Sequence, residues 1–177
     1  KGLLKSAIRD DNPVLCFEDK TMYKITGMIP SGEYTIPLGQ ADIKREGKDV
    51  TIVATMRMVH LALKAAEMLA EQGIYAEVVD PRTLKPLDEE TIVRSVRKTG
   101  RAVVVDQGYL SYGVTAEIAS MIADKAFDWL EAPVKRLGAM DVPSPYSPAL
   151  DPLTIPSEQM IFDTVMELFR KGESLGN

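Results

Sequence analysis

Short apolar runs and longer amphipathic stretches follow one another along residues 41–170. The clearest amphipathic stretch is residues 57–72, where apolar side chains recur every three or four positions and Gly73 follows as a stop signal. Short apolar or β-branched runs without this spacing predict strands. We expect strands at residues 50–55, 74–79, 102–105 and 134–137, and further helices at 88–98, 116–130 and 156–170.

Strands and helices that alternate at this spacing indicate βαβ units. Because such crossovers are right-handed, the strands form a parallel sheet with helices on both faces. A run as apolar as residues 102–105 is typical of a strand that is covered on both sides. We also expect residues 41–45 and 50–55 to form a hairpin around a turn at 46–49. The predicted fold class is therefore α/β, a three-layer αβα sandwich with a mostly parallel sheet and an antiparallel edge.

The first forty residues lack this alternation. Residues 2–9 have the apolar spacing of a helix, and the polar stretch that follows ends it at Pro13. Residues 14–17 are a short apolar run, which predicts a buried strand, and residues 20–37 carry glycines and prolines without a clear period. The pattern thus predicts a helix and one strand that have no sheet of their own, followed by a linker.

Composition and charge exclude several classes of protein. The 177 residues are 45% hydrophobic and 27% charged, and 21 basic against 26 acidic side chains leave a net charge of −5, which argues against a nucleic-acid partner. No apolar stretch approaches the roughly 20 residues that cross a bilayer, so no membrane partner is expected. A single cysteine, Cys16, excludes an internal disulfide framework and favours a reducing compartment, the cytoplasm.

Neither Cys16 nor the single histidine, His60, has the neighbours that a nucleophilic device needs. Cys16 lies in the apolar run and is interpreted as a small buried hydrophobe. His60 falls with Lys64 and Glu67 on the helix face opposite the apolar stripe, which predicts a solvated side chain. With one histidine and one cysteine, a zinc site is nearly excluded as well.

Polar residues do gather where two predicted strands end. Asp80 and Arg82 follow one strand, and Asp106 and Gly108 follow the next, at the edge where open α/β sheets bind ligands. Two interpretations stay open: a site for a small anion at Arg82, Asp106 and Gly108, or an internal ion pair between Arg82 and one of the two carboxylates. The proline-rich residues 138–156 are expected to form an irregular surface strap.

Four longer strings are specific enough, taken together, to indicate a family. They are GEYTIPLGQA at 32–41, VDPRTLKPLD at 79–88, LEAPV at 130–134 and DVPSPY at 141–146. The chain resembles, from Lys1 to about Arg170, the β subunit of the thiamin-diphosphate-dependent E1 component of 2-oxo acid dehydrogenase complexes. The string YSPAL at 146–150 looks closest to the pyruvate and acetoin types. Met56 departs from the family, in which a glycine is frequent at this position.

This resemblance implies a division of the chain and of the chemistry. Residues 1–20 look like the tail of a pyrimidine-binding domain, 21–40 like a linker, 41–170 like the transketolase C-terminal domain and 171–177 like a flexible tail. In the family, thiamin diphosphate and Mg²⁺ lie between an α subunit and the pyrimidine-binding domain of β. The resemblance therefore implies no catalytic, cofactor-binding or metal-binding residue in this chain, which alone is expected to be inactive.

The resemblance also implies partners. Family members form α2β2 heterotetramers, so an E1 α subunit and a second β subunit are expected. The family's C-terminal domain docks the small subunit-binding domain of the E2 acyltransferase through acidic groups, and the matching residue here is Glu131, with Asp141 as a weaker candidate. The alternative function, from a different class, is a stand-alone small-anion-binding or regulatory module that reuses this fold at the edge formed by Arg82, Asp106 and Gly108.

Overall fold

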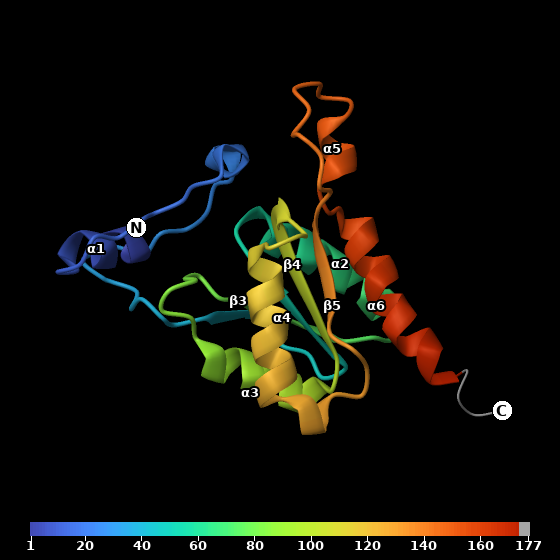
Figure 1. The fold of residues 1–177 in the computed structure, drawn as a ribbon. Helices are drawn as coiled ribbons and strands as arrows, with labels where there is room; N and C mark the ends of the chain where they lie inside the picture. The colour runs from blue at the N-terminus through green and yellow to red at the C-terminus, as the bar shows by residue number, and fades with distance from the viewer. Residues whose placement is uncertain (174–177) are drawn as a thin grey trace.

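The computed structural model describes residues 1–173 of the chain, with side chains through Arg170. Five strands form one sheet in the order β1-β3-β2-β4-β5 (Figure 1). Every neighbouring pair is parallel except β1 with β3, which confirms a mostly parallel sheet with an antiparallel edge. The strands are β1 (Asp42–Arg45), β2 (Val50–Ala54), β3 (Ala76–Asp80), β4 (Ala102–Tyr109) and β5 (Lys135–Ala139).

Helices cover both faces of the sheet, which gives the three expected layers. Figure 1 shows α4 in front of the sheet and α2 behind it. α2 (Arg57–Glu71) and α6 (Glu158–Glu173) pack against one face, while α3 (Glu89–Thr99) and α4 (Val114–Lys125) pack against the other. The predicted helices are thus confirmed, except that the one expected over residues 116–130 ends at Lys125. α6 continues to Glu173, so that only 174–177 of the expected tail lie outside the described residues.

The central strand β2 explains how the two halves of the core are built. All five of its residues are buried, and successive side chains enter opposite faces. Ile52 joins the cluster under α2 and α6, whereas Val53 joins the cluster under α3 and α4. Thr51 is the one polar residue of β2, and its hydroxyl is satisfied by Ser95 and Thr99 of α3, each at 2.8 Å.

The predicted hairpin between residues 41–45 and 50–55 is wrong. β1 pairs with β3 instead, with Asp42 opposite Asp80, because both sides of β2 are already occupied by β3 and β4. The chain passes from β1 to β2 across the start of β3, where a Cβ at Gly47 would lie 2.2 Å from the Ala76 carbonyl carbon. Only glycine fits this close approach, so the crossing depends on Gly47.

The N-terminal arm, residues 1–40, corrects a second prediction. α1 (Gly2–Arg9) forms as expected, but residues 14–17 are not a strand, and Leu15 and Phe17 are 82% and 78% exposed. Cys16 between them is exposed rather than buried. An apolar run becomes a buried strand only beside a neighbouring strand, and no strand of the described chain pairs with it. Figure 1 shows α1 standing away from the sandwich, and the short 3₁₀ helix η1 (Lys20–Lys24) follows it on the same arm.

The strap after β5 is extended, as the prolines predict, except for one helical turn. This turn, α5 (Asp151–Thr154), carries Pro152 in its first turn, where a missing N–H costs nothing. Exposed apolar side chains line the strap before and within the turn, among them Met140, Tyr146 and Leu153. Like the N-terminal arm, the strap offers apolar surface that nothing in the described residues covers.

Candidate functional site

The carboxyl edge of the sheet, where β2, β3 and β4 end, holds the predicted anion-site residues. The Arg82 guanidinium lies 2.5 Å from a carboxylate oxygen of Asp42, on the neighbouring strand β1. Asp80 accepts a hydrogen bond from the backbone N–H of Arg82 at 2.9 Å. Burial raises the pKa of the Asp80 carboxyl. The hydrogen bond from Arg82 and the positive charges of Lys44 and Arg82 offset this rise only in part. Burial opposes ionisation of Asp42 too, but Lys44 and Arg82 outweigh it and hold the pKa of Asp42 below its ordinary value.

Asp106 has other partners than Arg82. It follows the buried residues of β4, a strand that β2 separates from β3. Its carboxylate accepts hydrogen bonds from the Thr55 hydroxyl and, at 2.7 Å, from the backbone N–H of Gly108. Gly108 itself lies within β4, which runs to Tyr109, and not in a loop that could wrap a phosphate. The structure therefore brings Asp106 and Gly108 together but leaves Arg82 with Asp42, so the donors of the suggested anion site already have internal partners.

Backbone strain is concentrated at the same edge. Within the described residues, three other than glycine have a positive φ, namely Met56 (46°), Arg82 (60°) and Tyr112 (55°), and each lies in a connection from a strand to a helix. Residues that carry a side chain rarely adopt this backbone conformation, which costs on the order of 1–3 kcal/mol per residue. At Met56, where the sequence resemblance leads us to expect glycine, the φ of 46° with ψ of −123° is a conformation that glycine adopts at lower cost.

The amino edge of the sheet, where β4 and β5 begin, holds Glu131. Its backbone N–H donates to the Gly100 carbonyl at 2.8 Å, and its carboxylate lies 2.7 Å from the Arg101 guanidinium. Gly100 ends α3 with a φ of 71°, and a Cβ there would lie 2.9 Å from the Glu131 carboxyl carbon. The Glu131 side chain is nevertheless 58% exposed. The Glu131 carboxylate is thus held in place by Gly100 and Arg101 and remains accessible to solvent.

Arg101 is itself anchored. Its guanidinium lies 4.5 Å from the ring centre of Phe169 on α6, in the geometry of a cation–π contact. Its Nε is buried and has no hydrogen-bond partner among the described residues. An arginine fixed on one side by an aromatic ring and on the other by a carboxylate has little rotamer freedom, so Arg101 restricts where Glu131 can point.

Two aromatic side chains lie next to Glu131, and the sequence analysis did not identify them. The helix expected over residues 116–130 ends at Lys125, and a 3₁₀ turn, η2 (Phe127–Trp129), follows. Phe127 is 72% exposed and Trp129 is 46% exposed. The Arg97 guanidinium lies 4.1 Å from the Trp129 ring centre and donates to the Lys125 carbonyl at 2.9 Å, which fixes the turn. The signal was the string FDWLE, in which the two aromatics and the carboxylate follow at short intervals.

Asp141 does not belong to the same surface. It follows β5, whereas Glu131 precedes it, so the two carboxylates lie beyond opposite ends of one strand. Asp141 accepts a hydrogen bond from the Ser111 hydroxyl at 2.5 Å, within the connection between β4 and α4. The two predicted docking residues are therefore separated by the length of the sheet.

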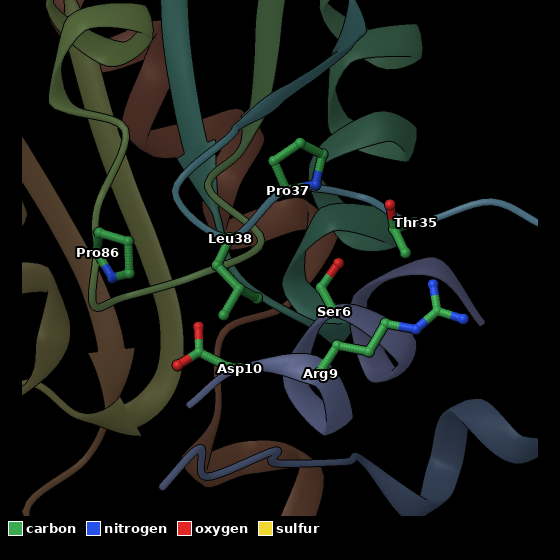
Figure 2. A pocket seen from close by; sticks show the side chains of 7 residues that line it. All are labelled: Ser6, Arg9, Asp10, Thr35, Pro37, Leu38 and Pro86. Atoms are coloured by element: carbon green, nitrogen blue, oxygen red, sulfur yellow. The ribbon is translucent and has the colours of Figure 1, made fainter. Parts of the chain in front are cut away.

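Two depressions lie along the N-terminal arm. The larger, about 530 Å³, lies where α1 meets residues 35–38 and Pro86; Figure 2 shows Ser6, Arg9 and Asp10 on its α1 side. The second, about 400 Å³, lies between η1 and α2, and half-buried His60 lines it, where a solvated side chain was expected. Cys16 does not line either depression.

Neither metal ligation nor a membrane span is indicated in the part of the chain that is described. No group of three His, Cys, Asp or Glu side chains within residues 1–173 is arranged to hold a metal ion. None of the helices there combines the length and the apolar character required to cross a bilayer.

The fold and the sequence together define the class of protein. Residues 39–161 match the family described as "Transketolase, C-terminal domain", and the chain belongs to that family. A solved structure with the same fold, a split-gene transketolase described as an inactive β4 tetramer, has 32% sequence identity and a TM-score of 0.64, and the match covers 80% of this chain and 45% of that one.

Relatives with curated names indicate which members of this class the chain is similar to. The chain is 49% identical over 168 residues to the β subunit of acetoin:2,6-dichlorophenolindophenol oxidoreductase from Bacillus subtilis, covering 95% of this chain and 49% of that one. It is 42% identical over 177 residues to the mitochondrial pyruvate dehydrogenase E1 β subunit of Dictyostelium discoideum, covering 98% and 50%. The resemblance to E1 β subunits of the pyruvate and acetoin types is thus confirmed, and the chain spans about half the length of the curated relatives it matches.

Proposed function

We propose that this chain is the C-terminal part of an E1 β subunit of a 2-oxo acid dehydrogenase complex, of the pyruvate or acetoin type. Its role there is subunit assembly and E2 docking during oxidative decarboxylation and acyl transfer to lipoyl groups. The observation that carries the proposal is the identity of 42–49% to such subunits over nearly the whole chain.

The chemistry of this oxidoreductase belongs to the complete α/β assembly. Thiamin diphosphate and Mg²⁺ supply the decarboxylating chemistry there, and the described residues of this chain include no acidic or imidazole cluster that fits the metal. Residues 1–20 form the tail of the pyrimidine-binding domain in this proposal, and 21–40 form the linker to the domain at 41–170. The exposed Leu15 and Phe17 support this division, because an apolar run of this kind needs a covering partner.

The proposed protein partners are an E1 α subunit, a second β subunit and the subunit-binding domain of the E2 acyltransferase. Apolar surface on the arm and the strap supports protein contacts in the assembled complex. The proposed location is the cytoplasm, or another reducing compartment, in keeping with one cysteine in 177 residues.

Glu131 is the proposed E2-docking residue, and Asp141 is the weaker one. Glu131 is open to solvent, and its second carboxylate oxygen has no partner in the described part of the chain, so it can accept from a basic group. Docking through exposed charges is fast and salt-dependent, which suits a reversible contact.

The test replaces Glu131 by lysine in the assembled E1. We expect Glu131→Lys to weaken binding of the isolated E2 subunit-binding domain at least tenfold at low salt, measured by calorimetry, with decarboxylation by free E1 unchanged. Glu67→Lys, the same charge change at an exposed position of α2, is the control and keeps wild-type affinity. Equal affinity of Glu131→Lys and wild type at low salt would contradict the docking role of Glu131.

A further inference from the structure

Beside the Glu131 carboxylate lies an apolar surface that the docking role of Glu131 alone does not explain. We infer that Phe127 and Trp129 of η2 form an apolar anchor site beside Glu131, and that the two together bind a basic segment that carries an apolar side chain. This acidic–aromatic surface is defined by Asp124, Phe127, Asp128, Trp129 and Glu131. The inference rests on the proposed function, because the occupant is taken to be the basic docking domain of E2.

The exposure of the aromatic pair is the first argument. A phenylalanine that is 72% exposed and a tryptophan that is 46% exposed lie two residues apart on one short turn. Aromatic residues are the types most enriched in the centres of protein interfaces, because they supply large contact areas with few rotatable bonds. In Figure 1, the turn that follows α4 lies at the end of the sandwich opposite α5, away from the strap and the N-terminal arm.

The turn is held by contacts within the chain itself. The Trp129 N–H donates to the Ala126 carbonyl at 3.0 Å, and the indole stacks on Arg97 at 4.1 Å. Arg97 in turn holds the end of α4 through the Lys125 carbonyl. An anchor site that is already ordered loses little conformational entropy when a partner binds.

The charged side chains near the aromatic pair include three carboxylates, which favour a positively charged partner. Asp124, Asp128 and Glu131 are all exposed and flank the two rings. The nearby cations have internal contacts: Lys125 pairs with Glu89, Arg97 stacks on Trp129, and Arg101 pairs with Glu131. Neither Asp124 nor Asp128 forms an ion pair with a described residue, so an approaching basic chain meets two unpaired carboxylates beside the aromatic pair.

The position of Glu131, two residues after Trp129, is fixed by its own supports. The contacts from Gly100 and Arg101 fix the backbone and one carboxylate oxygen, which leaves the other oxygen for the partner. A guanidinium or ammonium group bound there brings the rest of its chain within reach of Phe127, four residues earlier in the sequence. The partner's apolar side chain then covers the rings and removes them from water.

The first experiment uses Trp129 as a reporter, because it is the only tryptophan of the 177 residues. The chain is titrated with the cognate E2 subunit-binding domain in a variant without tryptophan, and emission is recorded with excitation selective for indole. We expect a shift to shorter wavelength that saturates with the binding isotherm measured by calorimetry. Binding without any change in Trp129 emission would overturn the inference and leave the proposed function standing.

The second experiment separates the apolar part from the charged part in the assembled E1. Phe127→Ala is expected to weaken binding of the E2 domain about tenfold or more, a loss that persists at high salt. Glu131→Gln is expected to weaken binding at low salt only, because the charge contribution is screened. Tyr75→Ala, which removes a partly exposed aromatic ring just before β3, outside the arm and the strap, is the matched control and keeps wild-type affinity.

The outcomes distinguish the two proposals. If wild-type E1 does not bind the E2 domain, the proposed docking function fails, and the anchor site loses its occupant with it. If Glu131→Gln weakens binding while Phe127→Ala matches wild type at every salt concentration, only the anchor site is overturned. Because Phe127 is mostly exposed, its variant is expected to fold, and an unchanged melting temperature checks that.

Discussion

The two edges of the central sheet differ in how their charged side chains are used. At the carboxyl edge, Arg82 pairs with Asp42, and Asp106 accepts from Thr55 and Gly108, so the polar groups satisfy one another. At the amino edge, Glu131 pairs with Arg101 but remains exposed, and two exposed aromatic residues precede it in the sequence. Open α/β sheets usually bind ligands at the carboxyl edge. The difference teaches that the location of a site depends on which polar groups remain available, and not on topology alone.

The largest expected effect tests what holds the amino edge together. Glu77 of β3 is fully buried there, and its pair with Lys98 of α3 compensates the charge. We expect Lys98→Met to lower the free energy of unfolding by about 2 kcal/mol, less than the roughly 3–5 kcal/mol of fully buried pairs because Lys98 reaches solvent. Lys64→Met, which removes a solvent-exposed ammonium 4.0 Å from Glu158, is the control for urea denaturation and changes little.

This ion pair also predicts a pH dependence. Burial would raise the pKa of Glu77, but hydrogen bonds, chiefly from Lys98, outweigh it and hold the pKa below its ordinary value. A depressed carboxyl pKa contributes stability that is complete above the ordinary value and is lost as the pH falls through the depressed one. The difference in unfolding free energy between wild type and Lys98→Met should therefore shrink below about pH 4. A constant difference from pH 7 to pH 3 would contradict the assignment.

A somewhat smaller effect is expected at Gly100, whose positive φ and close contact support Glu131. Gly100→Ala should cost about 1–2 kcal/mol in all, because alanine strains the left-handed backbone and its methyl group displaces the flexible Glu131 side chain. Gly73→Ala is a close control, because Gly73 has a φ of 78° but no atom within 4 Å of the added Cβ. If the two variants lose equal stability and both retain E2 affinity, Gly100 does not position Glu131.

The smallest expected effect is a gain at the carboxyl edge. Met56→Gly should raise the free energy of unfolding by about 1 kcal/mol, because glycine relieves the strain at φ 46° and the entropic cost of glycine offsets only part of it. E2 affinity should not change, since Met56 lies at the opposite edge. Met140→Gly is the control, because Met140 does not have a positive φ. We expect thermal denaturation to show no gain in stability for this variant. A destabilised Met56→Gly would mean that packing of the Met56 side chain outweighs its strain.

The sequence predicted the central elements well because their signals are local. Five buried residues in β2 and the amphipathic stripe of α2 specify their structure within one window of sequence. What failed depended on distant partners. The pattern of β1 does not encode that β3 inserts beside it, and the run at 14–17 does not encode whether a neighbouring strand exists.

The candidate sites follow the same rule. Glu131 was identified through a string shared with a family, but its support by Arg101 and Phe169 joins residues 30 and 68 positions apart, which no local pattern reveals. Arg82 was expected near Asp106 because both follow strands, yet its partner is Asp42 on β1, whose position in the sheet had been predicted wrongly. One error in strand order therefore led to the wrong ion-pair partner.

The outer strands of the sheet have a consequence for the behaviour of the chain in concentrated solution. β1 and β5 are the two outermost strands, and each has one side without a strand neighbour in the described chain. They are four and five residues long; β1 carries Asp42, Lys44 and Arg45, and β5 begins with Lys135 and Arg136. Short, charged outer strands are poor templates for the addition of strands from other molecules. The sheet itself is thereby protected against amyloid-like growth.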